Sequence, residues 1–427
     1  MRRLRYSFFQ SPSNLTTSCD LSRFYSSHNK LITTMTRLGY PSSEGLCHGV
    51  ACVAAQYHLS HDMKSFHRRI KFTEKNARFS DTTPEDVRRF FDDIVIGQSP
   101  EEYPVIKNVT STWKKNQGQN SIIALAAIQN TQITTQRGIK RIAHFTGAYS
   151  MLELRRYFDL LQESASATAC TFALLIGSPL HAIMIGFDFM AKKWVFVDAN
   201  RLPQRNFQYF NAARLALETN RALSSLKSGS TIFSTQLLTT RDAESAANNL
   251  LDQLNRDERW KKIHRVSERK AKMSDAFNSN WLMEACAIES EIDVVKSLIK
   301  KGANMGKMNQ LNLSPLAYAI FRGNHPATKM LLRKGADANH PENTYLCLAT
   351  ENGFYDAAKD LLSHGAKINP GYPSPLFVAA EKGDARFIRL FKNHGVTTAG
   401  NSLDRFLSRK PRTKAIRSDV ASPRCTY

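Results

Sequence analysis

Three polar residues of the 427-residue chain, Cys47, His181 and Asp198, have the types that nucleophilic thiol chemistry requires. A cysteine attacks in its thiolate form, and a neighbouring histidine produces that form by accepting the thiol proton. A carboxylate beside the histidine orients its ring and stabilises its charged state. If the fold brings these side chains together, the chain can carry out acyl chemistry through a covalent cysteine intermediate.

Cys47 lies where the sequence predicts the start of a helix. The segment GLCHGVACVAAQYHLSHDM places Val50, Val53 and Tyr57 at helical spacing after Gly45. The unpaired N–H groups and the dipole at a helix start stabilise a thiolate. This position favours a nucleophile, although a free cysteine packs equally well in a protein core.

His181 and Asp198 fall at the two ends of a predicted β-hairpin. His181 opens the apolar run HAIMIGFD, and Asp198 closes the run KWVFVD. A turn near Phe189-Met190 places the two residues directly opposite each other on one face, with Cβ atoms roughly 4.5–5.5 Å apart. A slip of one residue would place them on opposite faces. Two other interpretations stay open: His181 is a strand histidine with an ordinary hydrogen-bond partner, and residues 198–200 form an Asx turn.

The chain order Cys–His–Asp, with the cysteine at a helix start and the other two residues on a sheet, resembles papain-like cysteine proteases. The matching motifs are Gly45-Leu46-Cys47, Leu180-His181-Ala182 and Val197-Asp198. They are most similar to the YopT/AvrPphB type of effector protease, which bacteria inject into host cells. The resemblance covers residues 41–235, and it implies that Cys47 is the nucleophile, His181 the base and Asp198 the residue that orients the base.

One element of the papain-like pattern is missing ahead of Cys47. Such enzymes usually carry a Gln or Asn shortly before the nucleophile as a hydrogen-bond donor to the oxyanion, and residues 41–46 contain neither. The backbone N–H of Cys47 can supply one donor, and Ser43 or the more distant Asn29 is the candidate for the second. One such donor lowers the barrier by ~2.7–4 kcal/mol, so its absence would slow turnover.

A sequence repeat begins near Trp281. Each unit predicts two short helices, the second ending at a glycine that must adopt a positive φ. The recurring motifs are Gly302-Ala303, Gly335-Ala336 and Gly365-Ala366, and Ser314-Pro315-Leu316 with Ser374-Pro375-Leu376. The segments SPLAYAIFRGNHPATKMLLRKGADAN and SPLFVAAEKGDARFIRLFKNHG resemble ankyrin repeats, whose period is about 33 residues. The resemblance covers residues 279–396 and implies a surface that binds another protein.

The predicted fold class is α+β, with a papain-like domain of helices and antiparallel sheet followed by an all-α ankyrin solenoid. Helices are expected over Ser121–Gln129 and Ala148–Gln162, and strands over the runs TFALLIG, HAIMIGFD and KWVFVD. The predicted parts are a basic N-terminal extension over 1–40, the papain-like domain over 41–235, a charged helical linker over 236–278, the ankyrin repeats over 279–396 and a basic tail over 397–427.

The composition is that of a globular protein with a strong positive charge, since hydrophobic residues make up 42% and the formal net charge is +22. Both predicted ends are rich in Lys and Arg, which makes an anionic membrane surface a candidate partner. No nucleic-acid-binding motif accompanies the charge, so no nucleic acid is expected as a partner. No apolar run reaches the roughly 18 residues that a membrane span needs.

Cysteine and histidine spacing argues against a metal centre. The seven cysteines form no CxxC pair, so we expect neither a disulfide framework nor a zinc site, and we expect a reducing compartment. The histidines that follow Cys47 match no standard metal motif. No cofactor is predicted.

These observations predict a cysteine protease-like effector that acts in the reducing cytoplasm of a host cell. It would cleave or modify a host protein that the ankyrin repeats bind, because binding at a remote site raises the effective concentration at the active site. Two alternatives stay open. The same three residues could catalyse deamidation or acyl transfer, or the chain could be an inactive pseudoenzyme that serves as an ankyrin-repeat scaffold.

Overall fold

The computed structural model describes residues 31–40, 46–72, 83–98, 138–178, 181–202, 211–224, 229–339, 344–368 and 374–395. The chain divides into two compact units, Met1–Ala336 and Asp337–Tyr427. The basic tail, most of the N-terminal extension, the helix expected over Ser121–Gln129 and the candidate donors Ser43 and Asn29 lie outside the described residues. None of the helices in the described ranges is both long and apolar enough to cross a membrane.

The first unit contains a five-stranded sheet with the strand order β1-β5-β2-β3-β4, in which every neighbouring pair is antiparallel. The strands are β1 (Ile139–Ser150), β2 (Phe172–Gly177), β3 (Ala182–Asp188), β4 (Lys193–Asp198) and β5 (Ser230–Thr240). The three predicted apolar runs form β2, β3 and β4. Their alternating side chains are buried on both faces, so helices must cover both faces of the sheet.

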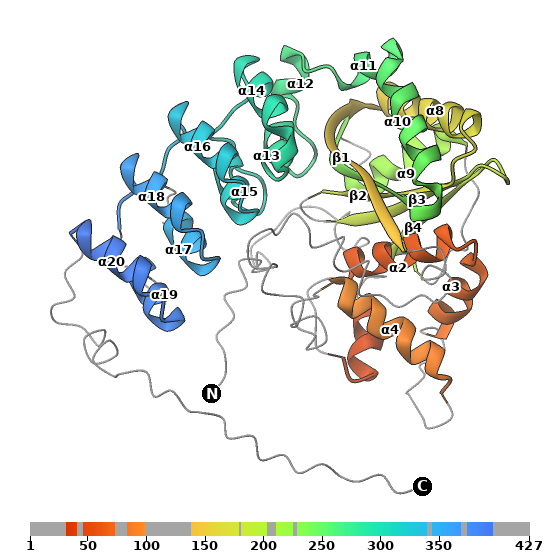
Figure 1. The fold of residues 1–427 in the computed structure, drawn as a ribbon, viewed down its shortest axis with the longest axis horizontal. Helices are drawn as coiled ribbons and strands as arrows, with labels where there is room; N and C mark the ends of the chain where they lie inside the picture. Colours follow the sequence, from red (N-terminus) through yellow and green to blue (C-terminus); the bar gives the residue numbers. More distant parts are fainter. Residues whose placement is uncertain are drawn as a thin grey trace, which may run out of the picture. The chain divides into compact units, whose positions relative to one another are not determined.

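Figure 1 shows those helices on either side of the sheet. One face carries α2 (Cys47–Leu59), α3 (Met63–Ile70) and α4 (Glu85–Gln98), and the other α8 (Met151–Ala167), α9 (Ala212–Leu223), α10 (Glu244–Arg256) and α11 (Glu258–His264). The side chains of β2 alternate between the hydrophobic cores on the two faces of the sheet. Ala173 and Leu175 pack with α2, while Leu174 and Ile176 pack with α8. Leu31 and Met35 also join the α2 core, ahead of the predicted domain start at residue 41.

Two segments differ from the sequence-based expectation. Residues 148–150, expected to be helical, end strand β1, and α8 begins only at Met151 behind a capping box between Ser150 and Glu153. Residues 236–240, assigned to a linker, complete β5, which lies between β1 and β2 in the sheet. The following helices α10 and α11 bury Leu250, Leu254 and Trp260 in the core, so this stretch is part of the first domain.

The repeats continue the first unit and form the second. Helices α12 (Glu268–Lys272), α13 (Trp281–Cys286), α14 (Ile292–Lys300), α15 (Pro315–Phe321) and α16 (His325–Arg333) lie in the first unit, and α17 (Thr344–Glu351), α18 (Tyr355–Ser363), α19 (Pro375–Lys382) and α20 (Ala385–Asn393) in the second. Ser314 caps α15 by accepting a hydrogen bond from the Ala317 N–H, with Pro315 as first helical residue. Gly335 and Gly365 follow their helices with φ of 88° and 86°, as the repeat predicts.

The first repeat packs directly on the sheet through a buried polar chain. The Trp281 indole N–H donates to Thr146 Oγ1 at 2.8 Å, and Thr146 Oγ1 donates to Glu291 Oε2 at 2.6 Å. Lys270 Nζ lies 5.4 Å from the Tyr149 ring centroid and 5.8 Å from that of Trp281. The hydrogen bonds satisfy groups that would otherwise be buried without partners, so helix α13 is joined to β1 in one arrangement.

Candidate active site

Cys47 is the first residue of α2, as the sequence predicts. The residue before it, Leu46, provides no side-chain cap, and the Gly49 N–H in the first turn donates instead to Gln98 Oε1 of α4 at 3.2 Å. Close packing fixes α2 against the sheet: a Cβ on Gly186 of β3 would lie 2.4 Å from the His58 ring. His58 Nε2 lies 3.1 Å from the carbonyl oxygen of Phe172, which ties the same helix to β2. These contacts fix the C-terminal end of α2 beside β2 and β3, and the Gly49–Gln98 hydrogen bond ties its first turn to α4.

The hairpin register differs from the prediction by two residues. Asp188 pairs with Lys193, so the turn spans residues 189–192, and Asp198 pairs with Ile183 rather than with His181. His181 precedes β3 by one residue and lies diagonally across from Asp198. A shift of two residues preserves the face to which each side chain points, so the two side chains still meet.

His181 and Asp198 form a short hydrogen bond, with His181 Nε2 2.8 Å from Asp198 Oδ1. The backbone N–H of Asn200 donates to the same oxygen at 2.9 Å, and Arg201 Nε lies 3.2 Å from Asp198 Oδ2. Both oxygens of the Asp198 carboxylate therefore have hydrogen-bond or ion-pair partners. Because Nε2 faces the carboxylate, Nδ1 is the ring nitrogen left for the Cys47 thiol, whose pKa the neighbouring His181 lowers.

The electrostatics of the three groups favour a thiolate–imidazolium pair. Burial raises the pKa of Cys47, but the His181 hydrogen bond and charge and the backbone hydrogen bonds of Ala182 and His48 outweigh it and lower the pKa overall. Burial lowers the pKa of His181, and the charge and hydrogen bond of Asp198 raise it overall above its usual range. Burial likewise disfavours ionised Asp198, yet His181 and Arg201 hold the pKa of its carboxyl below the usual value.

Cys47 differs in this respect from the other cysteines in the described ranges. All five are free thiols, and Cys47 alone among them is partly exposed. Burial raises the pKa of Cys52, Cys170 and Cys347 to about 12, and that of Cys286 still further. A thiolate is therefore favoured at one of the five positions.

The histidines that follow Cys47 have separate partners. His58 bonds to the Phe172 carbonyl oxygen, while His61 Nδ1 lies 3.4 Å from Asp188 Oδ2. Within the described ranges, no three His, Cys, Asp or Glu residues lie together in a way that could hold a metal ion.

Sequence reasoning missed a buried ionic network behind Asp198. Arg201 Nη1 lies 2.6 Å from Glu218 Oε2. The Glu218 side chain, of which 1% is exposed, also pairs with Arg214 at 2.7 Å and with Arg221 at 3.0 Å. Arg201 thus bridges Asp198 to α9. The spacing of Arg201 three residues after Asp198 was a signal for the first contact, but the contact with Glu218 depends on tertiary structure.

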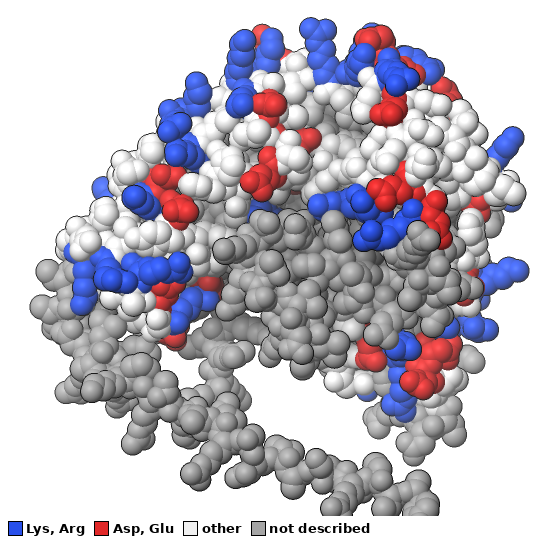
Figure 2. Space-filling view, in the orientation of Figure 1, with Lys and Arg blue, Asp and Glu red and all other residues white. Residues whose placement is uncertain are grey.

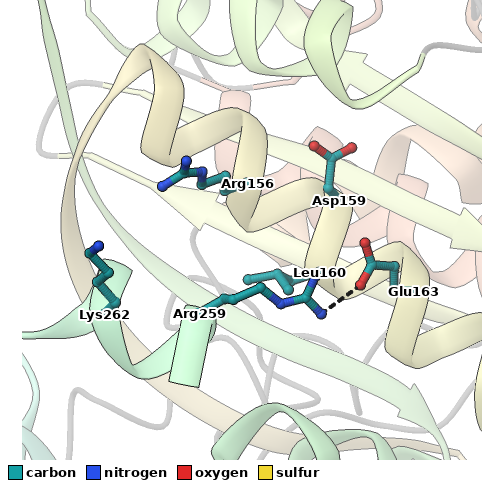
Figure 3. A pocket seen from close by; sticks show the side chains of 6 residues that line it. All are labelled: Arg156, Asp159, Leu160, Glu163, Arg259 and Lys262. Carbon is teal, nitrogen blue, oxygen red and sulfur yellow. Dashed lines mark hydrogen bonds and ion pairs between the residues drawn. The ribbon is translucent and has the colours of Figure 1, made fainter. Parts of the chain in front are cut away.

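A surface hollow elsewhere in the first unit is separate from these residues. Figure 3 shows it between α8 and α11, where Arg259 and Glu163 pair at 2.8 Å. It has a volume of about 330 Å³ and is lined by Arg156, Asp159, Leu160, Glu163, Arg259 and Lys262. Its lining includes none of Cys47, His181 and Asp198.

Comparison with known protein families confirms the repeats. Residues 282–372 match the family model of ankyrin repeats, in three copies. A search of curated proteins found no match to the chain. Ankyrin repeats generally bind other proteins through the extended surface of the stacked helices, so this part of the chain is a protein-interaction module.

Proposed function

We propose that the first unit is a papain-like cysteine hydrolase with Cys47 as nucleophile, His181 as general base and acid, and Asp198 as the residue that orients His181. The observation that carries the proposal is the buried His181–Asp198 pair at 2.8 Å, together with a Cys47 thiol at the start of α2 whose pKa the neighbouring His181 lowers. Such a grouping of nucleophile, base and orienting carboxylate is the arrangement by which unrelated folds activate a nucleophile.

The proposed chemistry follows from those contacts. The Cys47 thiolate attacks the carbonyl carbon of an amide, and the carbonyl electrons move to oxygen to give a tetrahedral oxyanion. The His181 imidazolium donates its proton to the leaving amine as the C–N bond breaks, which leaves a thioester on Cys47. Neutral His181 then takes a proton from water as the water oxygen attacks the thioester, and collapse of the second tetrahedral intermediate releases the acid product and the Cys47 thiolate beside the His181 imidazolium.

The ankyrin module suggests that the substrate is a folded protein. A target held by the repeats is presented to the hydrolase domain at high local concentration, without any change in the chemistry at Cys47. The five free thiols in the described ranges are compatible with a reducing compartment, and with the resemblance to injected effector proteases they support action in a host cytoplasm.

Two experiments test the proposal. A thiol-directed acyl probe should label Cys47 in the full chain and should fail to label the His181→Ala variant. A Cys47→Ala variant should retain the substrate, which can be recovered by affinity capture and then treated with the unaltered protein. Cleavage of the recovered protein would support a protease. Conversion of one of its Gln residues to Glu would support a deamidase, and transfer of an acyl group would support an acyltransferase. A probe that labels both proteins equally would contradict the hydrolase.

The second candidate is a protein-binding scaffold without turnover. The observation that favours it is the segment 41–46, which contains no Gln or Asn to donate to an oxyanion. The scaffold shares the ankyrin module with the hydrolase, so recovery of a partner alone does not separate the two. Chemical change in the recovered partner, dependent on Cys47, decides between them.

A further inference from the structure

One stretch of the repeats is basic without any compensating acid. Residues 294–336 hold eight Lys and Arg and no Asp or Glu. The eight residues are Lys296, Lys300, Lys301, Lys307, Arg322, Lys329, Arg333 and Lys334. Residues 337–395, in the second unit, carry both signs in nearly equal number, so the excess belongs to two consecutive repeats rather than to ankyrin repeats in general.

The cations at the ends of α14 and α16 form a row. Lys300 and Lys301 at the end of α14 correspond to Arg333 and Lys334 at the end of α16, 33 residues later, which is one repeat. A Cβ on Gly302 would lie 3.7 Å from Lys272 Cε, so α12 adds a further cation beside the first pair. We call Lys272, Lys300, Lys301, Lys329, Arg333 and Lys334 the basic ridge. All six are exposed, and Figure 2 shows Lys and Arg side chains projecting from the margin over α14 and α16.

Within the described residues, the structure records no ion pair or hydrogen bond for the side chains of the ridge. The acid of α14, Asp293, pairs instead with Lys296 at 2.8 Å, outside the ridge. A cation at the end of a helix is favourable because of the helix dipole, which accounts for one charge on each of α14 and α16. The remaining positive charges repel one another, and an anionic partner would relieve that repulsion.

We propose that the basic ridge binds an anionic membrane surface. Five of its six cations are Lys, a compact charge that does not require the fixed geometry of a single ligand. Clusters of four to eight cations are typical of sites for acidic lipids. The large hydrophobic side chains recorded as exposed, Leu152 and Met190, both lie outside the repeats, so the attraction is electrostatic, without insertion of an apolar side chain.

Two other anionic partners fit the ridge less well. Single-stranded nucleic acid is bound by stacking bases on exposed aromatic rings, and of the aromatic residues in 294–336, Tyr318 is buried and Phe321 half-buried. An acidic peptide gains specificity from a groove, whereas all six ridge residues are exposed. The ridge lies on the unit that contains Cys47, so the proposed binding would bring the hydrolase domain to the membrane, but it does not depend on the hydrolase activity.

The test is co-sedimentation of the full chain with vesicles of phosphatidylcholine alone and with vesicles containing 30% phosphatidylserine, roughly the acidic fraction that creates a negative surface potential. The ridge variant carries Lys300→Gln, Lys301→Gln, Arg333→Gln and Lys334→Gln. The matched control removes four exposed cations of the second unit, in the variants Lys359→Gln, Lys382→Gln, Arg389→Gln and Lys392→Gln. Circular dichroism verifies that both variants are folded.

We expect the unaltered chain to bind only the acidic vesicles and to be released by added salt. The ridge variant should lose affinity on the order of a hundredfold, and the control variant less than about threefold. Three results would overturn the proposal: no binding to acidic vesicles, equal losses in the two variants, or ridge-dependent binding to polyglutamate or RNA in the absence of vesicle binding. Because both variants retain the basic termini, binding through those ends would leave the two indistinguishable.

Discussion

Replacement of Arg201 by Met should destabilise the first unit and weaken the support of Asp198. Arg201 lies 3.2 Å from Asp198 Oδ2 and 2.6 Å from Glu218 Oε2. Removing one partner of a buried ion pair costs ~3–5 kcal/mol. Arg201 is 23% exposed and Glu218 keeps Arg214 and Arg221 as partners, so we expect a smaller loss, of about 2 kcal/mol in the free energy of unfolding. This corresponds to a fall in Tm of about 4–8 °C for a domain of this size.

The assay is urea unfolding of the full chain, with Arg214→Met as the matched control. Arg214 also pairs with Glu218, at 2.7 Å, but it is 47% exposed and has no recorded contact with Asp198, so its loss should cost less than about 1 kcal/mol. The pKa of Asp198 is lowered in the folded state, and its stabilising effect is lost as pH falls through that value. Arg201→Met raises that pKa, so acid unfolding should move to higher pH. Equal effects of the two variants would refute the bridging role of Arg201.

Three further substitutions test the packing of the repeats and their pH dependence. Trp281→Ala should lower the free energy of unfolding by about 3–5 kcal/mol, because it empties a buried site and leaves Thr146 without its donor; a loss below about 1 kcal/mol in urea unfolding would contradict the packing of α13 on β1. Gly365→Ala should cost about 1–2 kcal/mol because φ at this position is 86°, whereas Gly306→Ala, at a residue without positive φ, should have little effect on thermal unfolding. Burial raises the pKa of Glu284 to about 8, so the free energy of unfolding should fall by about 1.4 kcal/mol per pH unit as pH rises from 5 to 8. Glu284→Gln should remove that pH dependence. If the dependence is unchanged in the variant, Glu284 is ionised in the folded protein.

The repeats and the helix start at Cys47 could be predicted because their signals are local. Ser314-Pro315 at a helix start and Gly335 after a helix end act within a few residues, and recurrence at one period strengthens each signal. The position of Cys47 followed in the same way from the apolar spacing of its own helix. Neither prediction needed knowledge of distant contacts.

Strands β1 and β5 were missed because their sequences lack a clear apolar alternation. The sequence of β5, STIFSTQLLTT, is rich in Ser and Thr, and its hydroxyl groups are satisfied only by tertiary partners, such as Thr235 Oγ1 with Tyr157 at 3.1 Å. At the edge of the sheet, β1 pairs only with β5 among the described strands, and it is half-buried along most of its length. Such strands are recognised from pairing, which a single sequence does not contain.

The approach of His181 to Asp198 could be predicted, but the exact register could not. The turn over 189–192 contains Lys192 with a φ of 51°, and nothing in the residue types fixed its length at four. The predicted approach of the two side chains is still correct, because an error of two residues in the register leaves each side chain on the same face of the sheet. The bridge from Arg201 to Glu218 joins the turn that follows β4 to α9, which comes after residues 203–210 that the structure does not describe, and no local pattern indicates it.

The central claim is that His181 activates Cys47, and the most direct test is alkylation of Cys47 by iodoacetamide as a function of pH, read by mass spectrometry in the folded chain. The pKa of Cys47 is lowered, and that of His181 is raised to about 10, so the thiolate–imidazolium pair should persist from mildly acid pH to near 10. We expect rapid alkylation of Cys47 near pH 6, where the same cysteine in urea-denatured protein is nearly unreactive, and loss of this reactivity in His181→Ala. If Cys47 reacts no faster when folded than when denatured, and His181→Ala changes nothing, the thiol is not activated and the hydrolase proposal is wrong.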